Sequence, residues 1–354
     1  MIKFIHKYDD ITSVENLLKA WKEFKKGKSK REEVWEFERN LMDNIFSLHK
    51  DLKNPRHFLQ NERTSKIYKH GKYEAFNISD PKPRNIHKAS VRDRLLHHAV
   101  YRKFYPFFDK KFINDSYSCR KRKGTHRALN RFRDFARKES KNNTKTVCVL
   151  KCDVSKFFAS IDHKILIEIL EENIKDKDIV WLLSQIIWSF NSTRIGVGLP
   201  LGNLTSQLLV NIYMNKFDQF MKHKIKTKYY IRYADDFVIL SRDIKYLESI
   251  LPKIKEFLTN ELKLNLHPHK VSIETFASGI DYLGWVHFST HRVLRNSTKK
   301  RILKRIIEIN QNKLGEERKE ETIQSYLGIL SHGNTYGLQE KVVGLSKKFI
   351  INDK

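Results

Sequence analysis

The chain has 354 residues, in which 69 lysine and arginine residues outnumber 41 aspartate and glutamate residues, and its formal net charge is +28. This length is enough for roughly two or three subdomains with a sizeable core, and the positive excess repels itself unless a polyanion neutralises it. We expect nucleic acid as that polyanion, with an anionic membrane surface as the alternative; a membrane-spanning protein is excluded because no stretch approaches the roughly 18 apolar residues of a span.

The N-terminus and the cysteines indicate the cellular compartment. Residues 1–6 lack the apolar core of a signal peptide. Cys119, Cys148 and Cys152 form neither a zinc-binding pattern nor an even set for disulfide pairing, so reduced thiols are expected. Both observations favour a cytoplasmic protein.

Residues 1–80 are predicted to form a helical extension. Two patterns of Ser or Thr followed three residues later by Glu begin at Thr12 and Ser29, and each precedes apolar residues at helical spacing. They predict two helices within residues 12–50. The basic linker at residues 25–31 is either a solvated loop or a nucleic-acid contact, and its composition favours neither.

A strongly basic segment follows at residues 120–141. It contains ten lysine or arginine residues and two acids, with Phe132 and Phe135 interleaved. A charge run is ordinarily a solvated surface, but this one includes Gly124 and lies just before an acidic stretch. Because clustered guanidinium groups match phosphate oxygens with paired hydrogen bonds, the segment favours phosphate binding.

Asp153 ends a run of β-forming residues that begins at Thr146. A carboxylate at the end of a buried strand is costly to keep charged unless a metal ion or a base pairs with it. Further along, residues 196–207 contain glycine and proline, which let the backbone approach a ligand closely. The sequence from Gly202 to Gln207 then leads into a helix whose apolar stripe indicates core packing.

A pair of carboxylates, Asp235 and Asp236, is predicted at the turn of a β-hairpin, because aromatic and β-branched residues flank it on both sides. Adjacent buried carboxylates repel each other unless a divalent cation neutralises them, although aspartate is also common in ordinary polar turns. Two strands of one sheet could bring Asp235 beside Asp153. Carboxylates shared in this way can hold two Mg²⁺ ions about 3.5–4 Å apart, as in phosphoryl transfer.

The C-terminal region predicts helices over residues 297–312, 320–331 and 337–350. The first of these is basic and carries a stripe of isoleucine residues at helical spacing. Such a group of helices fits a subdomain that grips a nucleic-acid duplex through its backbone rather than its base edges.

The order of these motifs resembles that of a bacterial retroelement reverse transcriptase. Each motif alone is weak, but six in family order over about 200 residues are highly specific. The matching segments are Ser116–Gly124 (fingers), Asp153–Phe158 (motif A), Leu199–Gln207 (motif B), Tyr233–Asp236 (motif C), Leu264–Lys270 (motif D) and Gly279–Trp285 (primer-grip hairpin). The resemblance implies an α+β right-hand polymerase with an antiparallel palm sheet. The N-terminal helical extension (1–80) would precede the fingers and palm (81–290) and a helical thumb (291–354).

The finer resemblance is to the enzymes of diversity-generating retroelements and to their relatives in the unknown, antiphage defence-associated groups. Ser206-Gln207 stands where retroviral and group II intron enzymes usually read Ser-Pro. Ser325-Tyr326-Leu327-Gly328 near the C-terminus is similar to the same clade.

The resemblance assigns roles to the acids. Asp153 and Asp235 would ligate two Mg²⁺ ions, for which Mn²⁺ could substitute, and Asp236 and Val154 would complete the metal site. A primer 3′-hydroxyl would then attack the α-phosphate of a nucleotide. Lys270 matches the position proposed to protonate the leaving pyrophosphate as a general acid, with a plain surface charge as the alternative.

Nucleotide contacts are expected from several further residues. Arg120 is the expected triphosphate ligand, and Arg84 and Arg94 are further candidates. Phe158 falls where this family blocks a 2′-hydroxyl, so its ring would select deoxynucleotides by steric clash. Phe157 is the core aromatic of the pair.

Leu201, Gly202 and Gln207 belong to the expected nucleotide pocket. Leu201 replaces the Gln of accurate relatives, whose amide would form a hydrogen bond near the nucleotide sugar. In diversity-generating enzymes an apolar residue here accompanies misincorporation opposite adenine, so Leu201 is consistent with low fidelity. The antiphage relatives share this change.

The remaining expectations concern partners. Nucleic-acid contacts are expected from Lys121, Lys123, Tyr233, Lys299, Lys300 and Arg301. The implied partners are a template RNA, the cDNA and its RNA–DNA hybrid, deoxynucleotides, a dedicated structured non-coding RNA, and a small basic accessory protein or a second subunit. Two alternatives stay open: an antiphage enzyme that uses a non-coding RNA, a protein primer or untemplated synthesis, and a non-catalytic RNA-binding scaffold.

Overall fold

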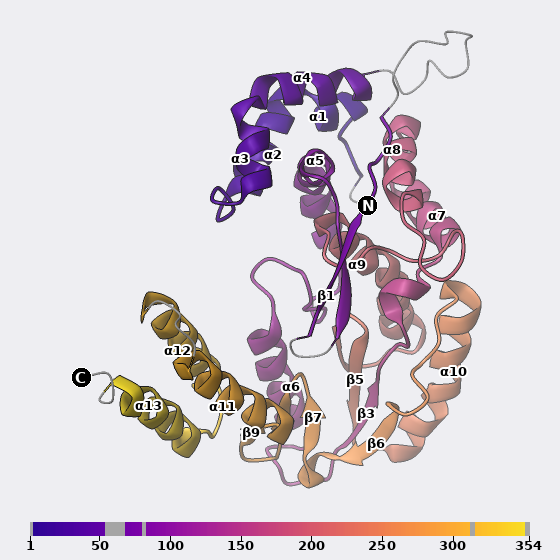
Figure 1. The fold of residues 1–354 in the computed structure, drawn as a ribbon. Coiled ribbons are helices and arrows are strands. Elements are labelled where there is room, and N and C mark those ends of the chain that lie inside the picture. The colour runs from indigo at the N-terminus through magenta and orange to yellow at the C-terminus, as the bar shows by residue number, and fades with distance from the viewer. Residues whose placement is uncertain (1–2, 54–67, 80–82, 312–315, 351–354) are drawn as a thin grey trace.

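The computed structural model describes residues 3–53, 68–79, 83–311 and 316–350. An antiparallel β-sheet lies in the body of the molecule, with the N-terminal helices at one end and the C-terminal helices at the other (Figure 1). The predicted α+β class and antiparallel sheet are confirmed. Within the described ranges, no helix is long and apolar enough to cross a membrane.

The N-terminal extension folds into more helices than predicted. It contains α1 (Tyr8–Thr12), α2 (Val14–Lys25), α3 (Glu32–Arg39) and α4 (Leu41–Leu52). The predicted helix starts were wrong, because Ser13 caps α2 by accepting a hydrogen bond from the main chain of Asn16. The hydroxyl of Thr12 instead donates to the carbonyl of Tyr8 within α1. Helix α3 begins after Arg31 without a side-chain cap.

An exposed hairpin and a long helix connect this extension to the sheet. Strands β1 (Glu74–Ile78) and β2 (Arg84–Lys88) form the antiparallel hairpin, and α5 (Val91–Asp109) follows it. Helix α5 contacts both α2 and α9 (Leu204–Gln219). The main-chain N–H of His87 donates to the carbonyl of Leu201 over 3.0 Å, which holds β2 against the segment that precedes α9.

The central sheet is buried on both faces. Its described strands are β3 (Cys148–Cys152), β4 (Tyr229–Tyr233), β5 (Asp236–Ser241) and β6 (Ser272–Thr275), in the antiparallel order β4-β5-β3-β6. On β5, Phe237 and Ile239 pack into one apolar cluster, and Val238 and Leu240 pack into another. Because successive side chains of a strand point to opposite faces, β5 reads as an unbroken apolar run from Phe237 to Leu240.

Different elements pack against the two faces of the central sheet. The first cluster includes buried residues of α5, α7 (His163–Asn173), α8 (Lys177–Trp188), α9 and α10 (Ile244–Leu262). The second includes residues of α6 (Thr125–Glu139) and of a small antiparallel sheet formed by β7 (Ile280–Tyr282), β8 (Trp285–His287) and β9 (Arg292–Leu294).

The C-terminal helices attach to the small sheet. They are α11 (Asn296–Gln311), α12 (Glu316–Leu330) and α13 (Tyr336–Ile350), which confirms the three predicted helices. Ile302 and Ile306 of α11 belong to the same apolar cluster as Trp285 of β8. The basic helix α11 is therefore anchored through its isoleucine stripe.

Candidate functional site

Asp153, Asp235 and Asp236 meet at one end of the central sheet. Asp153 directly follows β3, and Asp236 begins the neighbouring strand β5, where Phe237 pairs with Cys152. Asp235 occupies the turn between β4 and β5, where the sequence predicted a hairpin turn. Antiparallel pairing thus brings together carboxylates that are far apart in the sequence.

Burial and neighbouring negative charge raise the proton affinity of Asp235 and Asp236. Burial raises the pKa of Asp235 above its ordinary value, and the charge of Asp153 raises it further. Burial and the charges of Asp235 and Asp153 raise the pKa of Asp236 to about 7. An opposite charge would favour the ionised forms, so the site is electrostatically suited to a cation.

The donor set fits Mg²⁺, which prefers carboxylate and carbonyl oxygens. Val154 pairs with Leu266 in a β-bridge whose two hydrogen bonds are made by the main chain of Asp153 and Ser155, so they leave the Val154 carbonyl unused. Among the described residues, no group of three or more Asp, Glu, His or Cys side chains forms a ready-made metal site. The carboxylates are close enough to perturb one another without forming a complete coordination shell.

Lys270 lies at the same site. Its Nζ is 3.1 Å from Oδ2 of Asp153, and the two side chains are 43% and 13% exposed. A main-chain hydrogen bond of 2.7 Å from His267 to the carbonyl of Asp153 holds the turn that carries the lysine. The ammonium group of Lys270 therefore contacts a site carboxylate and is not an isolated surface charge.

A cavity of about 1000 Å³ opens beside the carboxylates. Its walls come from the β1–β2 hairpin, the turn after β3, the segment before α9 and the β4–β5 turn. The predicted residues that line it are Arg84, Phe158, Leu201, Gly202, Gln207, Tyr233, Asp235 and Asp236. Residues from four distant segments thus share one cavity.

The two adjacent phenylalanines separate as the sequence predicted. Phe157 is 4% exposed and packs in the core, whereas Phe158 lines the cavity. Their rings meet edge to face with centroids 5.6 Å apart. The main-chain N–H of Leu199 donates to the carbonyl of Phe158 over 2.8 Å, which fixes Phe158 against the segment before α9.

Gly202 is required by its surroundings. Its φ is +105°, and a Cβ there would lie 2.7 Å from Cγ2 of Ile86 on β2. Both the backbone conformation and the close approach of the hairpin exclude a side chain. This contact brings Arg84, at the start of β2, to the rim of the cavity.

The predicted triphosphate ligands occupy different environments. Arg84 is exposed at the cavity, and its charge partly offsets the burial that raises the pKa of Asp235. Arg94 lines a separate small pocket and forms an ion pair of 3.0 Å with Glu33. Arg120 is not among the cavity-lining residues.

The expectation for Arg120 needs correction. Its side chain is 5% exposed, and its Nε donates to the carboxylate of Asp109 over 2.7 Å. Its Nη atoms donate to the carbonyls of Asp109, Ile113 and Ser116. Because these bonds use most of its donors, Arg120 holds its own loop and is not available to a triphosphate.

Arg232 is a buried residue that the sequence analysis missed. Its Nη1 donates to the carbonyl of Ala234 over 3.0 Å, so it braces the turn that carries Asp235. The signal was present in the sequence, because Arg232 is the one charged residue in the apolar run Tyr229–Tyr233. A charge in a strand that is buried on both faces requires a partner.

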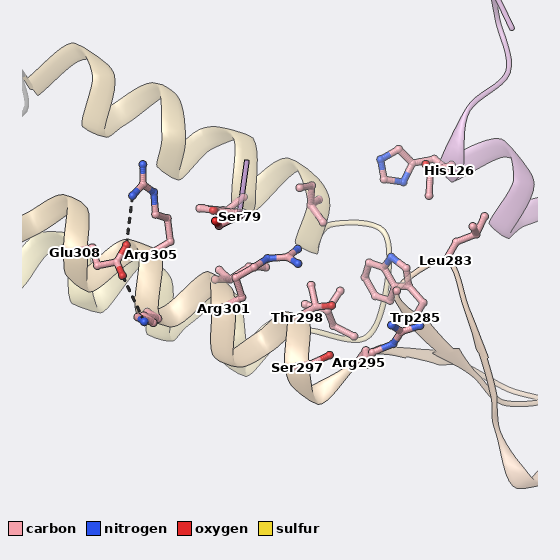
Figure 2. Close-up of a pocket in the computed structure, with 17 residues that line it drawn as sticks. Ser79, His126, Leu283, Trp285, Arg295, Ser297, Thr298, Arg301, Arg305 and Glu308 are labelled. Atoms are coloured by element: carbon pink, nitrogen blue, oxygen red, sulfur yellow. Dashed lines mark hydrogen bonds and ion pairs between the residues drawn. The ribbon is translucent and has the colours of Figure 1, made fainter. Parts of the chain in front are cut away.

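A second cavity, of about 1050 Å³, lies between the small sheet and the C-terminal helices (Figure 2). Arg301, for which the sequence predicted a nucleic-acid contact, lines this cavity together with Arg295 and Arg305. Lys299 and Lys300 belong to the same helix α11 but are not among its lining residues.

The other predicted nucleic-acid contacts, Tyr233, Lys121 and Lys123, lie in or near the first part of the basic segment. Tyr233 lines the first cavity, and its hydroxyl is 3.0 Å from Oγ1 of Thr125 at the start of α6. Lys123 donates to the main-chain and side-chain oxygens of Asn114, and Nζ of Lys121 lies 5.3 Å from the ring centroid of Tyr105. Both lysines therefore contact their own subdomain.

The family model for reverse transcriptase (RNA-dependent DNA polymerase) matches residues 69–287, more than half of the chain. Protein YkfC of Escherichia coli K12 is 25% identical over 261 residues, which cover 62% of this chain and 66% of that protein. The group II intron-encoded protein LtrA of Lactococcus lactis subsp. cremoris is 23% identical over 279 residues, which cover 59% of this chain and 44% of LtrA. The chain spans less than two thirds of the length of these relatives. Among solved structures, apo telomerase from Candida tropicalis has a TM-score of 0.48 and 12% identity, covering 64% of this chain and 55% of that chain.

Proposed function

Because this chain belongs to the reverse transcriptase (RNA-dependent DNA polymerase) family, we propose that it synthesises DNA on an RNA template by adding deoxynucleotides to a primer. Its fold is that of a right-hand polymerase with an antiparallel palm sheet. We assign residues 1–80 to the N-terminal extension, residues 81–290 to the fingers and palm, and residues 291–354 to the thumb.

The observation that carries the proposal is the shared cavity beside the sheet. It combines Asp235 and Asp236 with the ring of Phe158, the guanidinium of Arg84 and the backbone at Gly202. The carboxylates and Arg84 would serve the metal-bound phosphates of a nucleotide, Phe158 would face its sugar, and the backbone at Gly202 would lie beside its base pair. An RNA-binding scaffold would not need the half-buried carboxylates of Asp235 and Asp236, whose pKa is raised by burial and by neighbouring negative charge.

The reaction forms a bond between the primer 3′-oxygen and the α-phosphorus, and it breaks the bond from that phosphorus to pyrophosphate. Asp153, Asp235 and Asp236, with the Val154 carbonyl, would hold Mg²⁺. Bound Mg²⁺ supplies charge neutralisation at the attacking and leaving oxygens. The raised pKa of Asp236 supports this role, because a carboxylate that its neighbours destabilise gains most from a cation.

Two basic side chains would bind and protonate the leaving pyrophosphate. Arg84 lies at the cavity rim, where its planar fork would pair with phosphate oxygens of the nucleotide. Lys270, whose ammonium contacts Asp153, would donate a proton to pyrophosphate. This assignment replaces Arg120 with Arg84 as the main triphosphate ligand.

Phe158 and Leu201 would determine which nucleotides are added. The ring of Phe158 would clash with a 2′-hydroxyl and so select deoxynucleotides. Leu201 lines the cavity without a polar group, so it would hold the new base pair less strictly than Gln. Leu201→Gln is expected to lower the error frequency opposite template adenine, and an unchanged frequency would contradict low fidelity caused by Leu201.

The second cavity would hold the template–primer duplex. Arg295, Arg301 and Arg305 line it beside Trp285, so cationic and aromatic groups face one groove (Figure 2). Cationic side chains on the thumb would contact the phosphate backbone without reading its sequence. Leu283 lines both this second cavity and the cavity beside the carboxylates, so the duplex could extend from one cavity into the other.

For the biological role, we propose copying of a dedicated structured RNA in a diversity-generating retroelement, with errors concentrated at adenines. Leu201 and Gln207, which carry the resemblance to this clade, both line the nucleotide cavity. An antiphage enzyme with the same residues is the alternative. Sequencing of DNA from cells separates them: adenine-directed errors in cDNA from one nearby RNA support the first, and accurate, repetitive or untemplated products support the second.

Primer extension on an RNA template tests the activity itself. Asp235→Asn is expected to reduce extension by at least about a thousandfold, because it removes a charge that stabilises the transition state. Asp243→Asn is the matched control, since Asp243 only caps α10 by accepting from the main chain of Tyr246. Full activity of Asp235→Asn would overturn the assignment of the site.

A further inference from the structure

A small pocket of about 260 Å³ lies on the other side of the segment that forms one wall of the nucleotide cavity. We call it the basic pocket. Its lining comes from α2 and the following loop, from α5 and from the start of α9: Phe24, Lys28, Arg94, His97, His98, Gly202, Asn203, Leu204 and Gln207. Gly202 and Gln207 line both the basic pocket and the nucleotide cavity.

Basic groups gather around one aromatic ring in this pocket. Nζ of Lys28 lies 4.6 Å from the ring centroid of Phe24, and the guanidinium carbon of Arg94 lies 5.1 Å from it. The imidazole of His98 meets the same ring edge to face at 5.4 Å. The ring attracts the cations of Lys28 and Arg94, which repel each other, whereas burial lowers the pKa of His98 to about 4 and keeps its imidazole neutral.

Negative charge near these groups is scarce. Glu33 is 3.0 Å from Arg94, but it is also 2.6 Å from Nζ of Lys88 and is therefore shared. Among the described residues, Lys28 forms no ion pair, and its Nζ donates to the carbonyl of Phe24 over 3.1 Å. Burial lowers the pKa of Lys28, and the nearby arginines lower it further. The pocket thus holds positive charge that an anion would stabilise.

The backbone contributes to the same surface. Helix α9 starts at Leu204 without a side-chain cap, because the amide of Asn203 donates to the carbonyl of His87 over 2.7 Å. The first N–H groups of a helix carry partial positive charge and bind anions. His97, which is 1% exposed, also lines the pocket, and its Nδ1 has no hydrogen-bond partner in the described part of the chain.

We propose that the basic pocket binds one phosphate of the single-stranded template, just ahead of the base that is being copied. This inference rests on the proposed function. The primer end faces the carboxylates, and the template runs antiparallel to the primer, so its unpaired 5′ part begins beside the nucleotide cavity. A strand that leaves this cavity past Gly202 reaches the basic pocket on the other side of the same wall.

The phosphate would receive hydrogen bonds from Lys28, which approaches from the loop after α2, and from Arg94, which approaches from α5. Charge-assisted bonds of this kind are the strong ones. Holding the template at this phosphate would fix which base faces the nucleotide, and so set the register of copying. The basic loop at residues 25–31 thereby acquires a specific role through Lys28, while its exposed lysines stay in solvent.

The test measures equilibrium binding of the full chain, without nucleotides, to primer–template duplexes with RNA overhangs of increasing length. A neutral methylphosphonate replaces each overhang phosphate in turn. One position is expected to weaken wild-type binding about tenfold, the loss expected for one charge-assisted contact. Lys28→Ala is expected to weaken binding to the unmodified overhang by the same factor. In this variant, a methylphosphonate at that position should not weaken binding further.

Lys26→Ala and Lys30→Ala are the matched controls, because both lysines are exposed on the same loop. They are expected to keep the full methylphosphonate effect. In Lys28→Ala the dependence of log Kd on log salt concentration should also become shallower by about 0.7, which is the loss of one single-strand phosphate contact.

Three results would overturn the proposal. The first is that no single overhang phosphate matters, and the second is that its effect persists fully in Lys28→Ala. The third is that Lys28→Ala raises KM for the deoxynucleotide and leaves overhang binding unchanged, which would assign the pocket to the incoming nucleotide. Because the assay needs no catalysis, a failure of the pocket is distinguishable from a failure of the polymerase activity that Asp235→Asn tests.

Discussion

Arg232 and Asp218 form a two-point ion pair inside the protein. Nε of Arg232 donates to Oδ1 of Asp218 over 2.8 Å, and Nη2 donates to Oδ2 over 2.7 Å. The two side chains are 1% and 0% exposed. The hydroxyl of Tyr230 also donates to Oδ1, so the carboxylate is fully used.

This pair connects helix α9 to the turn of the carboxylates. Arg232 comes from β4, Asp218 from α9, and a further bond from Nη1 reaches Oδ1 of Asn211 at 3.3 Å on the same helix. The bond to the carbonyl of Ala234 then holds the residue next to Asp235. Helix α9 begins at the nucleotide cavity. The guanidinium of Arg232 therefore connects two walls of this cavity, α9 and the β4–β5 turn.

Replacing Arg232 is expected to damage stability and activity together. Arg232→Met leaves the buried carboxylate of Asp218 without its cation and, among the described residues, with only the hydroxyl of Tyr230 as a donor, which costs about 3–5 kcal/mol of unfolding free energy. Arg232→Lys keeps the charge but not the fork, so we expect a smaller loss of stability and a clear loss of kcat. Denaturant unfolding and primer extension measure the two effects.

Arg242→Met serves as the control for Arg232. Arg242 follows β5, is about half exposed, and its ion pair with Glu139 is 3.5 Å long. A surface pair of this kind contributes about 1 kcal/mol or less. Equal losses of stability for both substitutions would contradict the role of the buried pair.

The raised pKa of Asp236 predicts a pH-dependent stability of the metal-free chain. A carboxyl whose pKa is higher in the folded state favours folding when protonated, and this contribution is lost as pH rises through the folded value of about 7. Asp236→Asn cannot ionise, so its stability relative to wild type should increase between about pH 5 and pH 8 by on the order of 2–4 kcal/mol.

Urea unfolding in a metal chelator at several pH values checks this prediction. Asp243→Asn should run parallel to wild type across the same range, since Asp243 is an exposed helix cap. Added Mg²⁺ should reduce the difference between wild type and Asp236→Asn, because a cation stabilises the ionised form. Parallel curves for Asp236→Asn and wild type would show that the carboxyl is not perturbed.

Phe158 and Phe157 offer a matched pair for sugar selection. Phe158→Ala is expected to reduce the preference for deoxynucleotides over ribonucleotides at least about tenfold, because the ring no longer blocks a 2′-hydroxyl. Phe157→Ala removes a core side chain instead, so it should cost about 3–5 kcal/mol of stability without changing the preference. The measurement is the ratio of kcat/KM for the two nucleotides, and an unchanged ratio in Phe158→Ala contradicts the assignment.

Substitutions of Arg84 and Arg120 test which arginine binds the nucleotide and which one stabilises the fold. Arg84→Ala is expected to raise KM for the deoxynucleotide about tenfold or more, since it removes a charge at the cavity. Arg120→Ala should instead cost about 2–4 kcal/mol of stability, because it leaves the partners of a buried guanidinium without hydrogen bonds. If Arg120→Ala alone raises KM in a stably folded protein, the two assignments must be exchanged.

The meeting of the acidic residues at one end of the sheet could be predicted from the sequence, for a physical reason. Carboxylates at the ends of apolar strands are costly, so Asp153 and Asp235 stand out in the sequence. Strand pairing then leaves little choice in how they meet, because Cys152 pairs with Phe237 in one register. Separation of Phe157 from Phe158 follows in the same way from local packing.

The basic part of the site was predicted less well. Arg120 and Arg84 have the same side chain, and their roles differ only through distant neighbours: Asp109 and local carbonyls surround one, and the nucleotide cavity lies beside the other. The predicted start of α2 was also wrong, because Thr12 ends the preceding helix α1, where its hydroxyl donates to Tyr8, and its neighbour Ser13 caps α2.

The sequence by itself determined the α+β class, the order of the motifs and the identity of the carboxylates, because these depend on local patterns of apolar and charged residues. Only the tertiary structure decided which partners the basic side chains contact. A long basic side chain can reach a phosphate, a carboxylate or a carbonyl, and its choice depends on burial and on partners that are distant in sequence. Arg232 on Asp218, Lys270 on Asp153 and Lys28 beside Phe24 are each defined by such a partner.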